Sequence, residues 1–164
     1  MMGRALLIVG WLATLGLVVA GGLGYTATRA SPTMTPHILL AFSSSLLILF
    51  SHCWVMFYLI GTGTAIRQAV EEYGFESSIV EETKGYKNDS YPWLMAAMGL
   101  VIATFVFGGG TYAGALGSWL HHSLFYLTLI VQVRTLWIEG RVLLANHGLM
   151  DDINRRARAA ESPA

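Results

Sequence analysis

Charged residues are scarce in this chain. Lys, Arg, Asp and Glu together make up 12% of its 164 residues, whereas about 25% is usual in soluble domains. Hydrophobic residues make up 54%, and the formal net charge is zero. The low charge argues against an ordinary soluble domain, and the lack of a basic excess argues against a nucleic-acid partner. The sequence therefore predicts an integral membrane protein that lies in a lipid bilayer.

Cysteine is nearly absent, and several catalytic motifs are missing. Cys53 is the single cysteine, which excludes an intramolecular disulfide and the two-cysteine attachment motif of c-type haem. The chain has no Gly-rich phosphate loop, no His-Glu-x-x-His motif and no serine nucleophile elbow. These absences argue against a self-contained hydrolase or nucleotide enzyme. An electron carrier or a subunit of a larger assembly is expected instead.

Long apolar segments are present, and they predict an all-α, four-helix membrane bundle that crosses the bilayer up-down-up-down. A domain over residues 1–148 is expected to hold spans at 5–27, 36–67, 92–113 and 118–147. A charged cytoplasmic loop is predicted at 67–91, and a cytoplasmic tail at 149–164. The first apolar run also resembles a secretory signal cleaved after Ala30, but its length favours a retained anchor.

Basic residues predict the orientation of this bundle. In the four-span arrangement, Arg29 alone lies on one side, and the other side holds Arg4, Arg67, Lys84, Lys87, Arg141, Arg155, Arg156 and Arg158. Because positive charge is retained on the cytoplasmic side, both termini should be cytoplasmic. A multi-pass protein of a bacterial-type inner (plasma) membrane is expected.

The last apolar segment carries a regular polar seam. Its members recur at alternating steps of four and three residues, which places them on one helix face: His121, Phe125, Thr128, Gln132, Thr135, Glu139, Val142 and Asn146. Polar groups that face hydrocarbon are costly, so this face should point into the bundle. The second segment carries a matching face of small and polar residues that includes His37 and His52.

The histidines are the candidate cofactor ligands. His37 begins the second span, and His121 and His122 begin the fourth, so all three should lie near the outer surface. Haem b requires two axial ligands on facing helices at one depth, and Arg29 is a candidate partner for its propionates. The sequence leaves open whether His121 or His122 faces inward. Two other interpretations remain: a metal site made by His37, His121 and His122, and histidines that are simply tolerated at the interface.

His52 lies deeper in the second span, and three roles are open for it. It is a candidate axial ligand with a partner other than histidine, a candidate contact of a quinone, or a structural residue that hydrogen-bonds Gln132, Thr135 or a serine. Cys53 and Met56 add copper-ligating groups beside it. Neighbouring helix residues point about 100° apart, which argues against their convergence on one copper ion.

Three functional hypotheses follow. The leading one is a small membrane redox protein or subunit that holds haem b between the second and fourth helices and exchanges electrons with a quinone. The competing hypothesis is a non-catalytic accessory or assembly subunit of a larger membrane complex or homo-oligomer. The third is a proton or ion pathway along Gln132 and Glu139. For Glu139 itself, an ion pair that fixes the bundle is the favoured interpretation.

Overall fold

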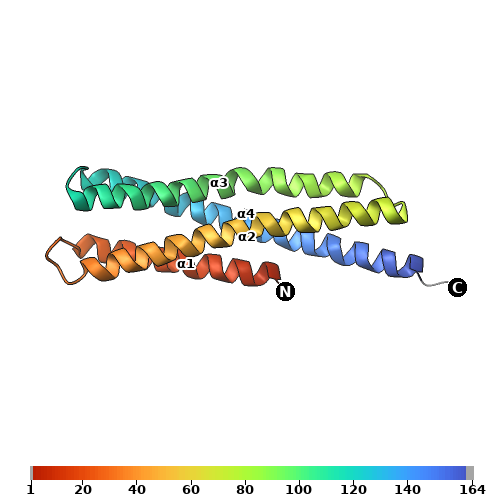
Figure 1. Cartoon of the computed structure of the whole chain (residues 1–164), viewed down its shortest axis with the longest axis horizontal. Helices are drawn as coiled ribbons and strands as arrows, with labels where there is room; N and C mark the ends of the chain where they lie inside the picture. Colours follow the sequence, from red (N-terminus) through yellow and green to blue (C-terminus); the bar gives the residue numbers. More distant parts are fainter. Residues whose placement is uncertain (1, 162–164) are drawn as a thin grey trace.

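A computed structural model describes residues 2–161, and its regular structure is entirely helical. The helices are α1 (Met2–Thr26), α2 (Met34–Tyr73), α3 (Ser78–Ala113) and α4 (Ser118–Glu161). Helices α1 and α2 form one hairpin and α3 and α4 form another, and both hairpins turn at the same end of the molecule (Figure 1). The connection from α2 to α3 lies at the opposite end. The all-α fold class is confirmed.

Three of the helices are long and apolar enough to cross a membrane, namely α1, α2 and α3. This supports the membrane protein expected from the composition. Helix α4 is not one of the three, and its apolar part is interrupted by Gln132, Arg134, Glu139 and Arg141. It nevertheless leaves large apolar side chains exposed along one side: Tyr126, Leu127, Ile130, Val133 and Trp137.

The helices extend well beyond the expected spans. Helix α2 has 40 residues and is therefore roughly 60 Å long, twice the hydrocarbon thickness of about 30 Å. Because α1 is shorter, one end of the molecule consists of α2, α3 and α4 alone (Figure 1).

Most of the charged segment 67–91 is helical, where a loop was expected. Helix α2 continues to Tyr73 and ends at Gly74, which adopts a left-handed conformation with φ of 67°. Helix α3 already begins at Ser78 and contains Pro92 in its interior. Helix α3 packs against α2 in this segment, and the Tyr91 hydroxyl donates to the Met56 carbonyl oxygen of α2 at 3.0 Å. The expected tail from residue 149 is likewise helical through Glu161, and its last three residues lie outside the described residues.

The inward faces predicted for α2 and α4 are confirmed. On α4 the buried polar side chains are Thr128, Gln132, Thr135, Glu139 and Asn146. On α2 the buried residues include Ser44, Ser45, Ile48, His52, Val55 and Leu59. Ile138, outside the seam, is also buried at 3% exposed and packs with Leu6 and Leu94. The buried arc of α4 is wider than one seam because this helix contacts all three others.

Polar contacts between helices fix how the hairpins pack. Ser51 Oγ donates to the Leu6 carbonyl oxygen and joins α2 to α1 at 3.1 Å. Thr128 and Thr135 of α4 donate to carbonyl oxygens of α3 at 3.2 Å each, those of Leu100 and Trp93. Each hydroxyl satisfies its hydrogen-bonding capacity inside the protein, as hydrocarbon surroundings require.

Candidate functional site

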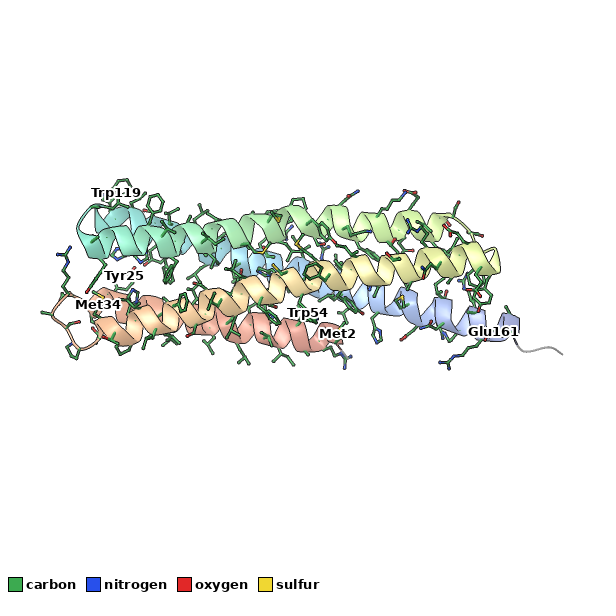
Figure 2. All side chains as sticks on the ribbon, viewed as in Figure 1. Met2, Tyr25, Met34, Trp54, Trp119 and Glu161 are labelled. Carbon is green, nitrogen blue, oxygen red and sulfur yellow. The ribbon has the colours of Figure 1, made fainter. Side chains whose placement is uncertain are left out.

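A cavity of about 560 Å³ lies near the end where both hairpins turn. Its volume is within the range of small-molecule and cofactor sites. All four helices line it, and its walls include Gly24, His37, Ser45, Thr104, Gly108, His121, His122, Phe125 and Thr128. Tyr25 and Met34, which also line it, lie at this end of the bundle, and Glu161 lies at the far end (Figure 2). The structure therefore brings together the three outer histidines predicted from the sequence.

His37 and His121 are held in the same way. His37 Nδ1 lies 2.7 Å from the Ala20 carbonyl oxygen of α1, and His121 Nδ1 lies 3.1 Å from the Thr104 carbonyl oxygen of α3. A carbonyl oxygen only accepts, so each Nδ1 carries the hydrogen and donates it. Nε2 of a neutral ring is then a free lone pair, and within residues 2–161 neither Nε2 makes a hydrogen bond. Metal-ligating histidines show this arrangement, in which the second nitrogen donates to a backbone carbonyl.

A glycine faces each of these two imidazoles. A Cβ atom added at Gly24 would lie 2.9 Å from His37 Cε1, and one added at Gly108 would lie 2.9 Å from His121 Cε1. Any larger residue would push the ring away from the helix backbone. The glycines therefore let each imidazole lie flat against the neighbouring helix and reach its carbonyl oxygen.

The two imidazoles lie close together in the wall of the cavity, in an edge-to-face arrangement. Their ring centroids are 6.5 Å apart and their planes meet at 80°. With metal–nitrogen bonds of about 2 Å, two imidazoles on opposite sides of one metal ion would have centroids roughly 6 Å apart. The spacing thus matches two axial ligands of a single metal. This pairing selects His121, and not His122, as the counterpart of His37.

The two hairpins repeat the same local design. The carbonyl, the glycine and the histidine stand at positions 20, 24 and 37 in the first hairpin and at 104, 108 and 121 in the second, a constant offset of 84. In both hairpins the carbonyl precedes the histidine by 17 residues. One imidazole from each hairpin therefore enters the cavity in an equivalent environment.

The outer end of the cavity is more polar. Arg29 lies there with its guanidinium carbon 5.9 Å from the centre of the Tyr112 ring. Thr111 Oγ1 is buried without a hydrogen-bond partner among the described residues. His122 packs against Tyr25 with ring centroids 5.2 Å apart. A cation and an unsatisfied hydroxyl at one end suit an anionic group of a ligand.

Metal sites of other kinds find less support. Within residues 2–161, no group of three or more His, Cys, Asp or Glu side chains is arranged to hold a metal ion. This includes His37, His121 and His122 as a set. Cys53 is exposed, with its Sγ 3.7 Å from Met98 Sδ, whereas the His52 ring is buried against α4. The residues expected for copper therefore diverge, as the helix geometry indicated.

His52 belongs to a buried polar network below the cavity. Its Nε2 lies 3.0 Å from Gln132 Oε1, so the structural hydrogen bond considered for it is present. Its Nδ1 lies 2.7 Å from Glu139 Oε1. Gln132 Nε2 donates to Thr14 Oγ1 at 3.2 Å, and Thr14 Oγ1 donates to the Gly10 carbonyl oxygen at 2.8 Å. Both imidazole nitrogens are engaged, so His52 has no free lone pair for iron.

Comparison with protein-family models, curated proteins and solved structures gives no match for this chain. The functional argument therefore depends on the geometry of the cavity and of the network beneath it.

Sequence reasoning missed several residues of both sites. Gly24 and Thr111 were not singled out, and His52 was not paired with Glu139. The run Gly108–Gly110 was expected to make room for a cofactor, but Gly108 was not paired with His121. A signal for the glycines is present in the sequence, because each stands 13 positions before its histidine. The pairing of His52 with Glu139 carries no such signal, because it depends on how two distant helices are rotated.

The His52–Glu139 pair yields a prediction about stability. His52→Leu should destabilise the protein by roughly 3–5 kcal/mol, because it leaves the Glu139 carboxyl group buried without its partner. The double variant His52→Leu/Glu139→Leu should be more stable than His52→Leu alone, because no uncompensated acid remains. Thermal unfolding in detergent, followed by circular dichroism, measures both. A double variant less stable than the single variant would show that the carboxyl group has another partner.

Proposed function

We propose that this protein is a membrane-bound electron carrier that holds one b-type haem between α2 and α4, with His37 and His121 as axial ligands. The observation that carries the proposal is the matched pair of imidazoles. In each ring Nδ1 donates to a backbone carbonyl oxygen and Nε2 is free, and the two ring centroids are 6.5 Å apart. Two nitrogen ligands complete a six-coordinate iron, which favours electron transfer over binding of oxygen or substrate.

The cavity supports haem b in particular. Gly24 and Gly108 keep space beside the two imidazoles, and the walls around them are largely apolar. The single cysteine argues for a haem that is not covalently attached. Arg29 and Thr111 at the outer end suit the two propionates, which are anionic and accept hydrogen bonds.

The electron partner is proposed to be a quinone dissolved in the bilayer. Ile38 and Phe105 line the cavity and remain 37% and 39% exposed, so one side of the cavity borders on lipid. An apolar carrier reaches this side without crossing a charged surface. The same apolar surfaces also fit the competing hypothesis of an accessory subunit packed in a larger complex, and the presence of haem distinguishes the two.

The proposed orientation places α4 across the bilayer as the fourth span and both termini in the cytoplasm. Support comes from the exposed apolar side of α4 and from the basic residues, of which only Arg29 belongs to the end where the hairpins turn. The cavity would then open toward the outer surface, and the three-helix end would project into the cytoplasm.

A visible spectrum tests the haem assignment. The purified protein should show the reduced-minus-oxidised bands of a six-coordinate haem b, and His37→Ala and His121→Ala should each lose them, since one imidazole alone leaves the iron five-coordinate and weakly held. His122→Ala and His147→Ala should keep the bands. Protein that is colourless, also after expression with added haem, would remove the carrier proposal and leave the accessory subunit.

Matched glycine variants strengthen this test, because they leave the ligands in place. Gly24→Leu should reduce haem content strongly, since its side chain takes the position of the His37 ring. Gly22→Leu serves as the control, because a Cβ atom at Gly22 meets nothing within 4 Å. Equal haem content in the two variants would contradict the proposed position of the ring.

Arg29 should tune the reduction potential. Reduction adds one electron, and a nearby cation stabilises the reduced state, so Arg29→Gln should lower the midpoint potential. Spectroelectrochemical titration measures the shift, with Arg67→Gln, at the opposite end of α2, as the control that leaves the potential unchanged. A potential that stays constant or rises in Arg29→Gln would place the propionates elsewhere.

Thiol labelling tests the orientation. In a Cys53→Ser background, Ala115→Cys in the α3–α4 turn should react with a membrane-impermeant reagent on intact cells or spheroplasts. Ser77→Cys in the α2–α3 connection should react only after the membrane is opened. The reverse pattern would invert the bundle, and labelling of both positions on intact cells would exclude four spans.

A further inference from the structure

The directions of the hydrogen bonds determine where protons lie in the network below the cavity. The Gly10 carbonyl oxygen only accepts, so the Thr14 hydroxyl donates to it and accepts in turn from Gln132 Nε2. Gln132 Oε1 therefore faces His52 and accepts from it, and His52 Nε2 carries a hydrogen. If the Gln132 amide were flipped, its oxygen would face the Thr14 hydroxyl, whose single hydrogen is already donated to the Gly10 carbonyl oxygen.

One further proton lies between His52 and Glu139. His52 Nδ1 and Glu139 Oε1 are 2.7 Å apart, and a single proton between them satisfies both atoms. The pair is then neutral, either as imidazolium and carboxylate or as imidazole and carboxylic acid. Loss of that proton would leave a net negative charge on two side chains that are 0% and 1% exposed, which is costly in such surroundings. The first proton is therefore firmly held.

Glu139 Oε2 supplies a place for a second proton. This atom is buried and has no hydrogen-bond partner among the described residues, an unfavourable state for a carboxylate oxygen. A proton bound there turns the pair into imidazolium and carboxylic acid, with one net positive charge. Because burial of this net charge is also costly, the second proton binds weakly and only at low pH. Toward the α2–α3 end, Asn146 lies two turns further along α4 and donates to the half-buried Thr62, which offers the next polar step.

Among residues 2–161, no ionisable side chain other than these two is hydrogen-bonded or ion-paired to His52 or Glu139. The titratable side chains at neighbouring positions are Arg4 on α1, Cys53 and the half-buried Tyr58 on α2, Tyr91 on α3, and Arg134 and Arg141 on α4. Arg4, Cys53, Arg134 and Arg141 are exposed, and Tyr91 donates to the Met56 carbonyl oxygen. Thr14 and Gln132 complete the surroundings and do not titrate. A pH response of this site thus belongs to His52 and Glu139.

We infer that His52 and Glu139 form a proton-binding site whose second proton, taken from water on the cytoplasmic side, is bound more tightly when the haem is reduced. The linkage to the haem depends on the proposed function, whereas the site itself does not. In the coupled step, an external one-electron donor such as a reduced mediator or quinol reduces ferric to ferrous iron, and Glu139 Oε2 gains H⁺. The electron's negative charge is partly offset by the proton's positive charge.

The distance between the haem site and the His52–Glu139 pair determines how strongly reduction of the haem raises the proton affinity of the pair. His52 follows His37 by 15 positions on α2, which corresponds to roughly 22 Å at 1.5 Å per residue. At an effective dielectric constant of about 20, one electron at that distance changes the proton affinity about threefold. For a one-electron couple this corresponds to a shift of about 30 mV in midpoint potential between high and low pH.

Infrared spectroscopy tests the site without any cofactor. In the full-length protein in detergent, the C=O stretch of a buried carboxylic acid should grow as the pH is lowered. It should be missing in Glu139→Gln and kept in Glu71→Gln, a control at an exposed position. A pH difference spectrum that is identical in the protein and in Glu139→Gln would overturn the proton site, whether or not haem is bound.

Potentiometric titration tests the linkage in the haem-loaded protein. The midpoint potential should fall by about 30 mV as the pH rises through the range of the infrared transition, and this part of the fall should be lost in Glu139→Gln. His52→Gln is the second variant, because it removes the imidazole but keeps an amide for Gln132. Unchanged pH dependence in whichever of these variants folds would overturn the linkage, while absence of haem would overturn the proposed function alone.

Discussion

Polar groups that are buried in a membrane bundle have no water to bind, so they must form hydrogen bonds within the protein. This requirement governs the position of α4. Each buried polar member of its seam bonds to a different neighbour, so the rotation and the height of α4 are set by several contacts at once. These contacts join Thr128 and Thr135 to α3, Gln132 to α1 and α2, and Glu139 and Asn146 to α2. A one-residue change of phase would leave most of them unpaired.

The position of the candidate haem site follows from the same contacts. Once the height of α4 is fixed, His121 stands at the level of His37, and α1 and α3 each present a glycine and a carbonyl oxygen to one ring. The rings are therefore oriented before any ligand arrives. Such preorganisation lowers the ordering cost that accompanies ligand binding.

Local periodicity made part of this arrangement predictable. The inward face of α4 could be derived because residues spaced by three and four share one side of a helix, whatever lies opposite. The depth of His37 and His121 followed from the order of the spans. Their partners did not follow, since the pairing of His52 with Glu139 depends on the relative rotation of helices 87 residues apart in the chain.

The charged segment 67–91 is a region whose secondary structure was predicted wrongly from its local composition. Its charges indicated a loop, because charged residues commonly accompany the end of a membrane span. The helices instead continue as a three-helix extension, in which Thr83 and Ser90 of α3 are buried. The N-terminal part of α3 is stabilised because one of its faces is buried against α2 and α4. This packing cannot be predicted from the local composition of the segment.

The equal spacing of carbonyl, glycine and histidine gives the two hairpins a local pseudo-symmetry at the cavity. It does not extend to the network beneath, because the offset of 84 that relates the two histidines places Glu139 of α4 opposite Val55 of α2. A cofactor in the cavity would therefore meet like groups on its two sides, while the acidic group below it comes from one hairpin alone.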